Sequence, residues 1–458
     1  MKTRPILLFP CYFLVAFSFG FLFFVSCQKV TSLNKAPVSS QDTNQLSGKP
    51  NIIFILADDC GFEIPTCNGG GSYSTPNIDL LSKSGMRFTQ CYSLPLCSPS
   101  RIELITGKYN FRNYTLWGTL NTSEKTFANM FHNTGYKTCY AGKWQLDGGD
   151  SSIHKFGFDK YLVWLPFLTN KEPTESKYRY KNPHLYQNGK FLSAPQTAGK
   201  YADDMFVNYI TRFIDSNLTK PFFVLYSTSL VHQPYGPTPD DPEFANWDYT
   251  TMASDTKFFP GMVKYMDKEI KKIIDKLISR GLMNNTVIVF TGDNGTPDDI
   301  VSLFKGKQIQ GGKGTSTIYG THVPLIVKWP GTVSAGEVSD ALIDFSDFLP
   351  TLANVSHIPV PVNYGPLDGV SFVSALSGSD TNLRKWAFGC WMNRVTEGKW
   401  QRWVQNRRYK LYDSVYQNNF FNIITDPLQV NPLPKDDLTS DELAIKNKFT
   451  KVLSTMHK

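Results

Sequence analysis

Four residues with oxygen-bearing side chains stand in two pairs, each directly after an apolar run. Asp58 and Asp59 end the run NIIFILADD, and Asp293 and Asn294 follow TVIVFTG. A single Asp after a strand is usually a turn residue or a helix cap, but two such pairs are harder to explain in that way. Three carboxylates and an amide form the oxygen cage that a hard cation such as Ca²⁺ or Mg²⁺ prefers. The pattern therefore predicts a metal site.

A cysteine and an arginine suggest a nucleophile. Cys97 opens the segment CSPSRIELITG, which contains Pro99 and Arg101. Pro suits the first turn of a helix, so Cys97 is expected at a helix N-terminus, where backbone amides favour an anion. The guanidinium of Arg101 adds a fixed fork of donors. On these residues alone, a thiolate nucleophile is the generic interpretation.

Three further residues are candidates for acid–base or charge-stabilising roles. His232 lies in VHQP, after the apolar run PFFVLYSTSL, while Lys143 and Lys313 lie in the glycine-containing turns AGKW and GGKGT. Each has a plain structural alternative, a core histidine or a surface lysine. Glycine next to a lysine lets the backbone turn the side chain inward, which keeps both lysines as candidates.

The elements around these residues must bring them together. The runs ending at Asp58, His232 and Asp293 are short and continuously apolar, as in strands buried on both faces of a parallel sheet. Helical spacing of apolar residues follows from Met262 to Leu277, and a second helix pattern lies around Phe127 to Phe131. This alternation predicts an α/β fold with a mostly parallel sheet. Ligands of such sheets bind beyond the carboxyl ends of the strands, so one site is expected from distant segments.

Together these segments resemble the type I sulfatases of the alkaline-phosphatase-like superfamily. The family signature, Cys-x-Pro-x-Arg before a Leu-Thr-Gly stretch, is matched by Cys97, Pro99, Arg101, Leu104, Thr106 and Gly107. The resemblance runs from about Asn51 to the end of the chain. It includes ILADD, the GKW turn, HQP, MVKYMDKEI, TGDNG and KGTSTIYGTHVPLIVKWPG, with weaker matches in DFSDFLPTL, LDGVSF and RRYKLY.

The resemblance implies a fold, an activity and a set of roles. The fold is a large, mostly parallel sheet flanked by helices, with a smaller C-terminal subdomain containing an antiparallel sheet. The activity is that of a sulfuric ester hydrolase, in which a formylglycine-generating enzyme converts Cys97 to formylglycine and the hydrated aldehyde attacks sulfur. One Ca²⁺ per active site would be held by Asp58, Asp59, Asp293 and Asn294. Arg101 would stabilise the diol, Lys143 and Lys313 would bind sulfate oxygens, and His232 would protonate the leaving alcohol.

The chain departs from the family pattern at two places. Gln145 stands where the family usually has a His, the favoured base for releasing sulfate, and Gln cannot accept a proton at neutral pH. Either a carboxylate, a lysine or water replaces that base, or sulfate release is slow, or the protein only binds. We favour replacement, because the other groups are present. The family's Glu-Gly-Gly-x-Arg is replaced by residues 318–322, which makes Tyr319 and His322 candidates for a changed substrate pocket or for simple loop packing. Gln145, which can still form hydrogen bonds, is the third candidate substrate-binding residue.

The N-terminus reads as a targeting segment. Lys2 and Arg4 precede an apolar run from Ile6 to Val25, and Ser26 and Cys27 follow, which resembles a bacterial lipoprotein signal. Lipidation of Cys27 would anchor the protein to a membrane; the alternative is an uncleaved anchor helix. We expect the protein outside the cytoplasm, in the bacterial periplasm or at the outer membrane. The expected division is a signal (1–27), a polar linker (28–48), a catalytic domain (49–375) and a C-terminal subdomain (376–458).

Composition limits the classes of partner. Hydrophobic residues make up 41% of the 458 residues, which is enough for a large core and excludes wholesale disorder. The formal charge of +8 is spread along the chain, so we expect no nucleic acid. Aromatic and cationic residues in 160–200 and 234–258 make a sulfated glycan a plausible substrate, against the alternative of solvated loops. The alternative functions are a phosphate or phosphonate ester hydrolase and a catalytically impaired glycan-binding lipoprotein.

Overall fold

The computed structural model describes residues 48–168, 175–379, 381, 383–392 and 399–456. The predicted signal segment 1–27, with Cys27, lies outside the described residues, as does nearly all of the predicted linker. No helix within the described ranges is long and apolar enough to cross a membrane. The boundary between residues 375 and 376 stays a prediction.

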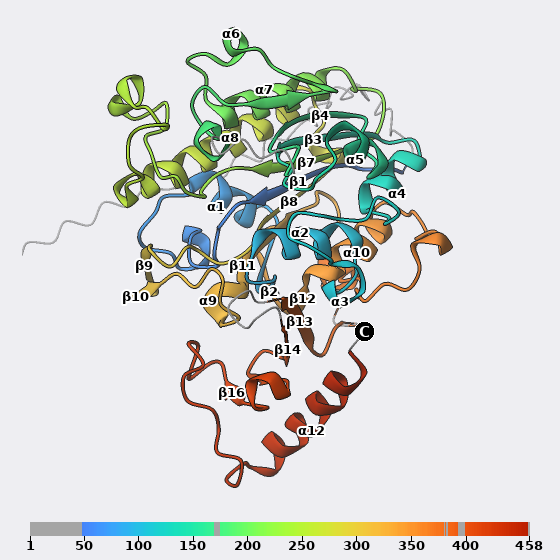
Figure 1. Ribbon diagram of the computed structural model, residues 1–458. Coiled ribbons are helices and arrows are strands. Elements are labelled where there is room, and N and C mark those ends of the chain that lie inside the picture. Colours follow the sequence, from blue (N-terminus) through green and yellow to red (C-terminus); the bar gives the residue numbers. More distant parts are fainter. Residues whose placement is uncertain (1–47, 169–174, 380, 382, 393–398, 457–458) are drawn as a thin grey trace, which may run out of the picture. The chain divides into compact units, whose positions relative to one another are not determined.

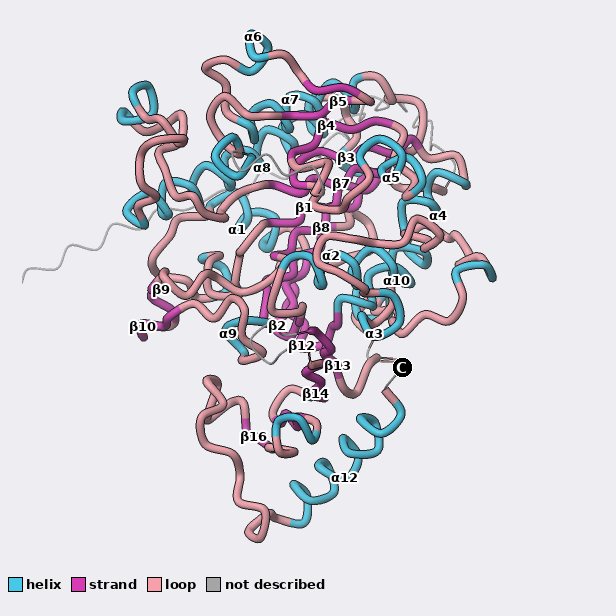
Figure 2. The backbone as a smooth tube through the Cα atoms, in the orientation of Figure 1, coloured by secondary structure: helices cyan, strands magenta, loops and turns pink. Residues whose placement is uncertain are grey.

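A ten-stranded sheet forms the centre of the catalytic region, in the order β12-β2-β11-β8-β1-β7-β3-β4-β5-β6 (Figures 1 and 2). β1 pairs in parallel with β7 and β8, whereas β11 runs antiparallel to β8 and β2. The expected α/β fold with a mostly parallel sheet is confirmed. The strands are β1 (Asn51–Ala57), β2 (Met86–Tyr92), β3 (Lys137–Lys143), β4 (Lys160–Trp164), β5 (Leu185–Gln187), β6 (Lys190–Phe191), β7 (Phe222–Thr228), β8 (Thr286–Gly292), β11 (His322–Lys328) and β12 (Glu337–Asp344).

Helices cover both faces of this sheet, so its central strands β1, β7 and β8 are buried along their whole length. All seven residues of β1 are buried, and successive side chains point to opposite faces. Ile53 and Ile55 belong to the core beneath α1 (Pro76–Lys83), α7 (Ala202–Asp215) and α8 (Phe259–Ser279). Phe54 and Leu56 belong to the opposite core, whose helices are α2 (Cys97–Thr106), α4 (Phe127–Asn133), α5 (Gly149–Lys155), α10 (Phe348–Val355) and α11 (Val373–Leu376).

Short elements complete the catalytic region. The stretch 160–200 is not a solvated loop in its described parts, because β4 pairs with β3 and the antiparallel β5 and β6 extend the sheet beyond it. A separate hairpin is formed by β9 (Val301–Phe304) and β10 (Lys307–Gln310). The remaining short helices are α3 (Asn110–Asn113), α6 (Ala194–Thr197) and α9 (Ile318–Thr321).

A second, antiparallel sheet forms near the C-terminus, as expected. Its strands lie in sequence order: β13 (Ala387–Met392), β14 (Trp400–Gln405), β15 (Tyr409–Tyr412) and β16 (Phe420–Asn422). The amphipathic helix α12 (Ser440–Thr455) packs on β14 and β15 and contributes Phe449 to their core. β13 also contacts β12, so the small sheet continues from the edge of the large one.

Candidate active site

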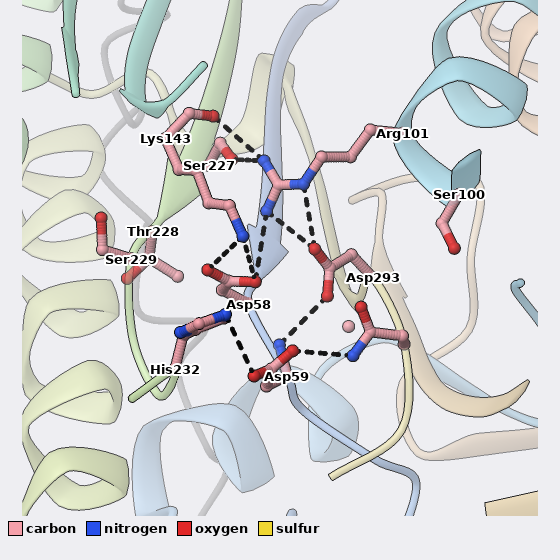
Figure 3. Close-up of polar contacts among 12 residues, drawn as sticks. Asp58, Asp59, Ser100, Arg101, Lys143, Ser227, Thr228, Ser229, His232 and Asp293 are labelled. Carbon is pink, nitrogen blue, oxygen red and sulfur yellow. Dashed lines mark hydrogen bonds and ion pairs between the residues drawn. The ribbon is translucent and has the colours of Figure 1, made fainter. Parts of the chain in front are cut away.

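The predicted catalytic and metal-binding residues meet beyond the carboxyl ends of four adjacent strands, β8, β1, β7 and β3. Figure 3 shows six of them: Asp58, Asp59, Arg101, Lys143, His232 and Asp293. Asp58 and Asp59 directly follow β1, Lys143 is the last residue of β3, and His232 comes four residues after β7. Asp293 and Asn294 follow β8 in the same way. The parallel arrangement therefore positions side chains that are more than two hundred residues apart in sequence.

Asp58 forms the centre of a buried ion-pair network. The Lys143 ammonium lies 2.8 Å and 2.7 Å from its two carboxylate oxygens, and both side chains are fully buried. Lys143 can reach inward because Gly142 lets β3 approach β7, where a Cβ would overlap the Ser227 carbonyl. Although burial opposes ionisation, the cations around Asp58 hold the pKa of its carboxyl well below the ordinary range.

Arg101 links the Cys97 helix to two of these strands. Its Nε and a terminal nitrogen lie 2.9 Å and 2.8 Å from the Asp293 carboxylate. The other terminal nitrogen donates to the Lys143 carbonyl, at 3.0 Å, and to the Ser227 hydroxyl. α2 begins at Cys97, as Pro99 predicted, so Arg101 lies one turn into the helix and fixes its start against the sheet.

Asp59 carries the second group of contacts. The Lys313 ammonium lies 2.6 Å from Asp59 Oδ2, and His232 Nε2 lies 3.7 Å from the same oxygen. Asn294 donates its side-chain amide to Asp59 Oδ1 at 2.8 Å. The other ring nitrogen of His232, Nδ1, lies 2.6 Å from the Gln233 carbonyl, so Nε2 is the nitrogen that faces the site.

The buried oxygen cluster fits a hard cation. Donor atoms of Asp58, Cys97 and Asp293 lie within 4.8 Å of one another, and so do those of Asp58, Asp59 and His232. The Oδ1 atom of buried Asn294 has no hydrogen-bond partner among the described residues. Buried carbonyl oxygens are rarely left unpaired, so this atom is free for a ligand. Asp58 belongs to both groups and Asn294 lies 2.8 Å from Asp59, so the four predicted ligands are neighbours.

Cys97 is buried. All six described cysteines are free of disulfide bonds. Burial raises the pKa of the Cys97 thiol, and the nearby carboxylates oppose the effect of the Lys143 charge. Burial therefore disfavours the thiolate form of the unmodified side chain.

Three predicted pocket residues have different surroundings. Gln145 is buried at a positive φ of 51°, and its Oε1 has no hydrogen-bond partner among the described residues. His322 stacks on Phe62 at 3.9 Å and bonds the Thr89 carbonyl, which is the contact pattern of a packed histidine. Tyr319 and His322 both line a cavity of about 490 Å³ whose lining includes none of the predicted catalytic or metal residues.

The aromatic residues of the stretches 160–200 and 234–258 are mostly packed inside the protein. Trp164, Tyr180, Tyr186, Trp247 and Tyr249 are all buried in the cores on the two faces of the sheet. The expectation that they offer stacking surfaces for sugars is wrong for these five, because strands and short helices place them against other apolar side chains.

Two residues reach the network that the sequence did not assign to it. Ser227, near the end of β7, accepts from Arg101. Arg179, from the chain before β5, approaches Asp58 Oδ2 at 3.4 Å. The sequence pointed to Arg179 only as one of several cationic residues between positions 171 and 181.

Comparisons with known proteins identify the family of the chain. The profile of the family described as Sulfatase matches residues 50–358, and that of the N-sulphoglucosamine sulphohydrolase C-terminal region matches residues 318–458. An N-acetylgalactosamine-6-O-sulfatase of Bacteroides thetaiotaomicron is 29% identical over 438 residues, covering 79% of this chain and 83% of its own. Arylsulfatase G of Rattus norvegicus is 30% identical, covering 72% of this chain and 69% of its own.

Solved structures of other proteins have a similar fold. That of Ps i-CgsB in complex with k-i-k-neocarrahexaose has a TM-score of 0.72 and 26% identity, covering 89% of this chain and 92% of its own. A phosphonate monoester hydrolase of Agrobacterium radiobacter shares the fold, with a TM-score of 0.64 at 18% identity. The chain belongs to the type I sulfatases, of the alkaline-phosphatase-like fold. It is a sulfuric ester hydrolase.

Proposed function

We propose that this sulfatase removes sulfate from a sulfated glycan, using formylglycine made from Cys97 and one Ca²⁺ ion. The observation that carries the proposal is the meeting of Cys97, Asp58 and Asp293 donor atoms within 4.8 Å at the start of α2. The substrate class is supported by relatives, among them the N-acetylgalactosamine-6-O-sulfatase above and an ulvan-active sulfatase of Formosa agariphila, 25% identical over 84% of this chain and 68% of its own.

Asp58, Asp59, Asp293 and Asn294 would hold the ion. When bound, Ca²⁺ supplies positive charge that polarises a sulfate oxygen and the nucleophile. Cys97, once converted by a formylglycine-generating enzyme, supplies an oxygen nucleophile as the hydrated aldehyde. Arg101 keeps the start of α2 in place, because it bonds Asp293, Ser227 and the Lys143 carbonyl together.

The two lysines and the histidine complete the proposed chemistry. Lys143 and Lys313 are held at Asp58 and Asp59, where they offset the charge on the sulfuryl oxygens. His232 directs Nε2 toward the site and delivers the proton to the leaving alcohol from that atom.

The proposed location is outside the cytoplasm. Lipidation of Cys27 after cleavage of the signal would tether the enzyme in the bacterial periplasm or at the outer membrane, where sulfated polysaccharides are accessible. Labelling with a radioactive fatty acid, in wild type and in Cys27→Ser, tests the anchor: label on the wild type alone supports it, and label on neither contradicts it.

The central test combines a mass measurement with an activity assay. Protein made in a host able to form formylglycine is digested with trypsin, and the mass of the Cys97 peptide is measured. Sulfate release is then followed on a panel of sulfated sugars and an aryl sulfate, with Cys97→Ala as the control. An aldehyde at position 97 with sulfate release that C97A lacks is expected. An unmodified thiol in a competent host would overturn the formylglycine mechanism.

The same assay separates the alternative functions. We expect kcat/KM on sulfate esters to exceed that on matched phosphate and phosphonate esters, and the reverse order would favour a phosphate or phosphonate ester hydrolase. Sugar binding without turnover by the converted protein would favour a binding lipoprotein.

Removal of Ca²⁺ tests the metal site. Chelation should remove activity and lower the thermal midpoint, and added Ca²⁺ should restore both. An unchanged midpoint after chelation would contradict the metal assignment.

A further inference from the structure

Arg179 is presented to the active site by a firmly held segment. It follows the short helix Glu175–Tyr178 and precedes β5. The hydroxyl of the next residue, Tyr180, donates to the carbonyls of Ser229 and His232, and the Tyr180 carbonyl accepts from Ala202 of α7 at 2.8 Å. The position of Arg179 is therefore tied to the same backbone that carries His232.

The Arg179 side chain points inward. Its guanidinium carbon lies 4.2 Å from the centre of the Trp164 ring, a stacking distance, and Trp164 itself ends β4 beside Lys143. A terminal nitrogen lies 3.4 Å from Asp58 Oδ2. The residue is 5% exposed, and its Nε has no hydrogen-bond partner within the described part of the chain. A buried guanidinium with an unused donor implies a further acceptor.

The charges of the described site leave Arg179 without a carboxylate of its own. The three carboxylates are paired at short distances with one cation each: Asp58 with Lys143 at 2.7 Å, Asp59 with Lys313 at 2.6 Å and Asp293 with Arg101 at 2.8 Å. Arg179 is a fourth cation, in a second and longer contact with Asp58. A buried surplus charge is costly unless an anion joins it.

We propose that Arg179 is a catalytic residue that binds the sulfuryl oxygens of the substrate beside Asp58. This inference rests on the proposed function of the same site. A planar guanidinium can give two parallel hydrogen bonds to one sulfuryl group, which a lysine cannot. Its position favours the sulfuryl group over a second anionic group elsewhere on the sugar, because Arg179 is buried and contacts Asp58, beside which the proposed nucleophile lies.

The kinetic test uses a substrate with a single anion. Arg179→Gln and Arg179→Lys are compared with wild type on 4-nitrophenyl sulfate and on a sulfated sugar. Lys177→Gln, an exposed residue of the same segment that bonds only the Thr250 carbonyl among the described contacts, is the matched control. Loss of one donor to a developing charge costs about 10²- to 10³-fold in kcat. We expect that loss in R179Q on both substrates, a smaller one in R179K and none in K177Q.

Unchanged hydrolysis of 4-nitrophenyl sulfate by R179Q would overturn the proposal. If R179Q keeps wild-type kcat/KM on 4-nitrophenyl sulfate and only its KM for the sugar rises, then Arg179 binds a second anionic group of the sugar and not the reacting sulfuryl group. A merely structural role would instead lower the thermal midpoint of R179Q and leave its affinity for inorganic sulfate unchanged. R179K, which keeps the charge and much of the volume, provides the folded variant in case glutamine is not tolerated.

A binding measurement tests Arg179 independently of turnover. Inorganic sulfate is titrated calorimetrically into Cys97→Ala and into Cys97→Ala/Arg179→Gln, both in Ca²⁺. We expect at least tenfold weaker sulfate binding in the double variant. Equal affinities would overturn the proposal. Because neither protein can turn over, this result is the same whether or not formylglycine chemistry is correct, so failure of the mechanism and failure of the Arg179 assignment remain distinguishable.

Discussion

Gln145 occupies the position at which the resemblance to sulfatases leads us to expect a histidine. It lies two residues after Lys143, is buried, and leaves Oε1 without a partner in the described structure. A general base contributes about 10²- to 10⁴-fold to a rate, and an amide cannot be one. We therefore expect Gln145→Ala to lower kcat by less than about tenfold, since a different group takes the proton.

Gln145→His is the informative partner of that variant. If another group already serves as base, the histidine leaves kcat nearly unchanged, and single-turnover and steady-state rates of sulfate release agree in both proteins. A large gain in kcat for the histidine variant, with a sulfate adduct trapped on the Cys97 peptide of the wild type, would show instead that release is slow.

The sequence predicted most of the site because its residues follow strong local patterns. Asp58 and Asp293 come directly after continuous apolar strands, and such strands end at one edge of a sheet. Arg179 has no such pattern: its place depends on β4 and β5 folding onto the sheet edge and on a stack against Trp164. The role of Ser227 could not be predicted from the sequence either, because its contact with Arg101 depends on the close approach of β3 and β7 at Gly142.

At the scale of elements, β1 is held between two helical layers, and Phe54 is its largest side chain on the α2 side. It is fully buried and contacts Phe127 of α4 and Phe348 of α10 at ring distances of 6.1 Å and 5.3 Å. Phe54→Ala should lower the free energy of unfolding by about 3–5 kcal/mol, because it leaves a cavity that these rings cannot fill. Denaturant unfolding measures the change.

Leu80→Ala is the matched control for that substitution. Leu80 lies on α1 and is 57% exposed, so its removal should change stability by less than about 0.5 kcal/mol. Equal effects of the two variants would contradict the assignment of Phe54 to a tightly packed layer.

Asp203 makes the α7–β7 contact dependent on pH. It is fully buried, accepts from the hydroxyls of Tyr226 and Thr228, and leaves Oδ2 without a partner among described groups. Burial raises the pKa of Asp203 from 3.8 to about 6. Between about pH 4 and 6 the folded protein therefore keeps a proton that the unfolded chain has released. The cost of ionising Asp203, about 2–3 kcal/mol, builds up as the pH rises through that window and is complete above it.

Asp203→Asn should remove that dependence while keeping an acceptor for both hydroxyls. Wild type should gain stability relative to the variant as the pH falls from 7 to 4.5, measured as the difference in unfolding free energy at the two values. The exposed Asp298→Asn serves as the control. Parallel pH profiles of wild type and D203N would contradict the raised pKa.

Strands at the edge of the sheet were harder to predict than those at its centre. β5 and β6 have three and two residues and no continuous apolar run, because an edge strand is buried on fewer sides. Their sequence therefore looks like that of a loop. The segment from Leu185 to Phe191 forms a hairpin whose first strand pairs with the edge of β4. The Tyr186 ring packs against Tyr161 and Phe167, which holds the hairpin on the sheet.

At the scale of the whole catalytic unit, the C-terminal sheet reaches back to the active-site loop. Lys410 of β15 is fully buried, and its ammonium donates to the Ser316 carbonyl, three residues after Lys313. The Tyr412 hydroxyl lies 2.9 Å from the Ser316 hydroxyl and also bonds Gln429. The RRYKLY segment thus fixes the loop that brings Lys313 to Asp59.

Lys410→Met tests this link, because methionine keeps the volume among Trp403 and Tyr412 but removes the donor to Ser316. A misplaced group near the reacting atoms can cost about 10²-fold, so we expect kcat/KM to fall about tenfold to a hundredfold. Lys448→Met, on the exposed side of α12, should leave kcat/KM unchanged. If K410M lowered only the thermal midpoint and kept wild-type kcat/KM, the small sheet would stabilise the fold without positioning Lys313. We expect activity to fall more steeply than stability. The Ser316 carbonyl still accepts a hydrogen bond from Tyr412, but the loop loses the contact with Lys410 that positions it.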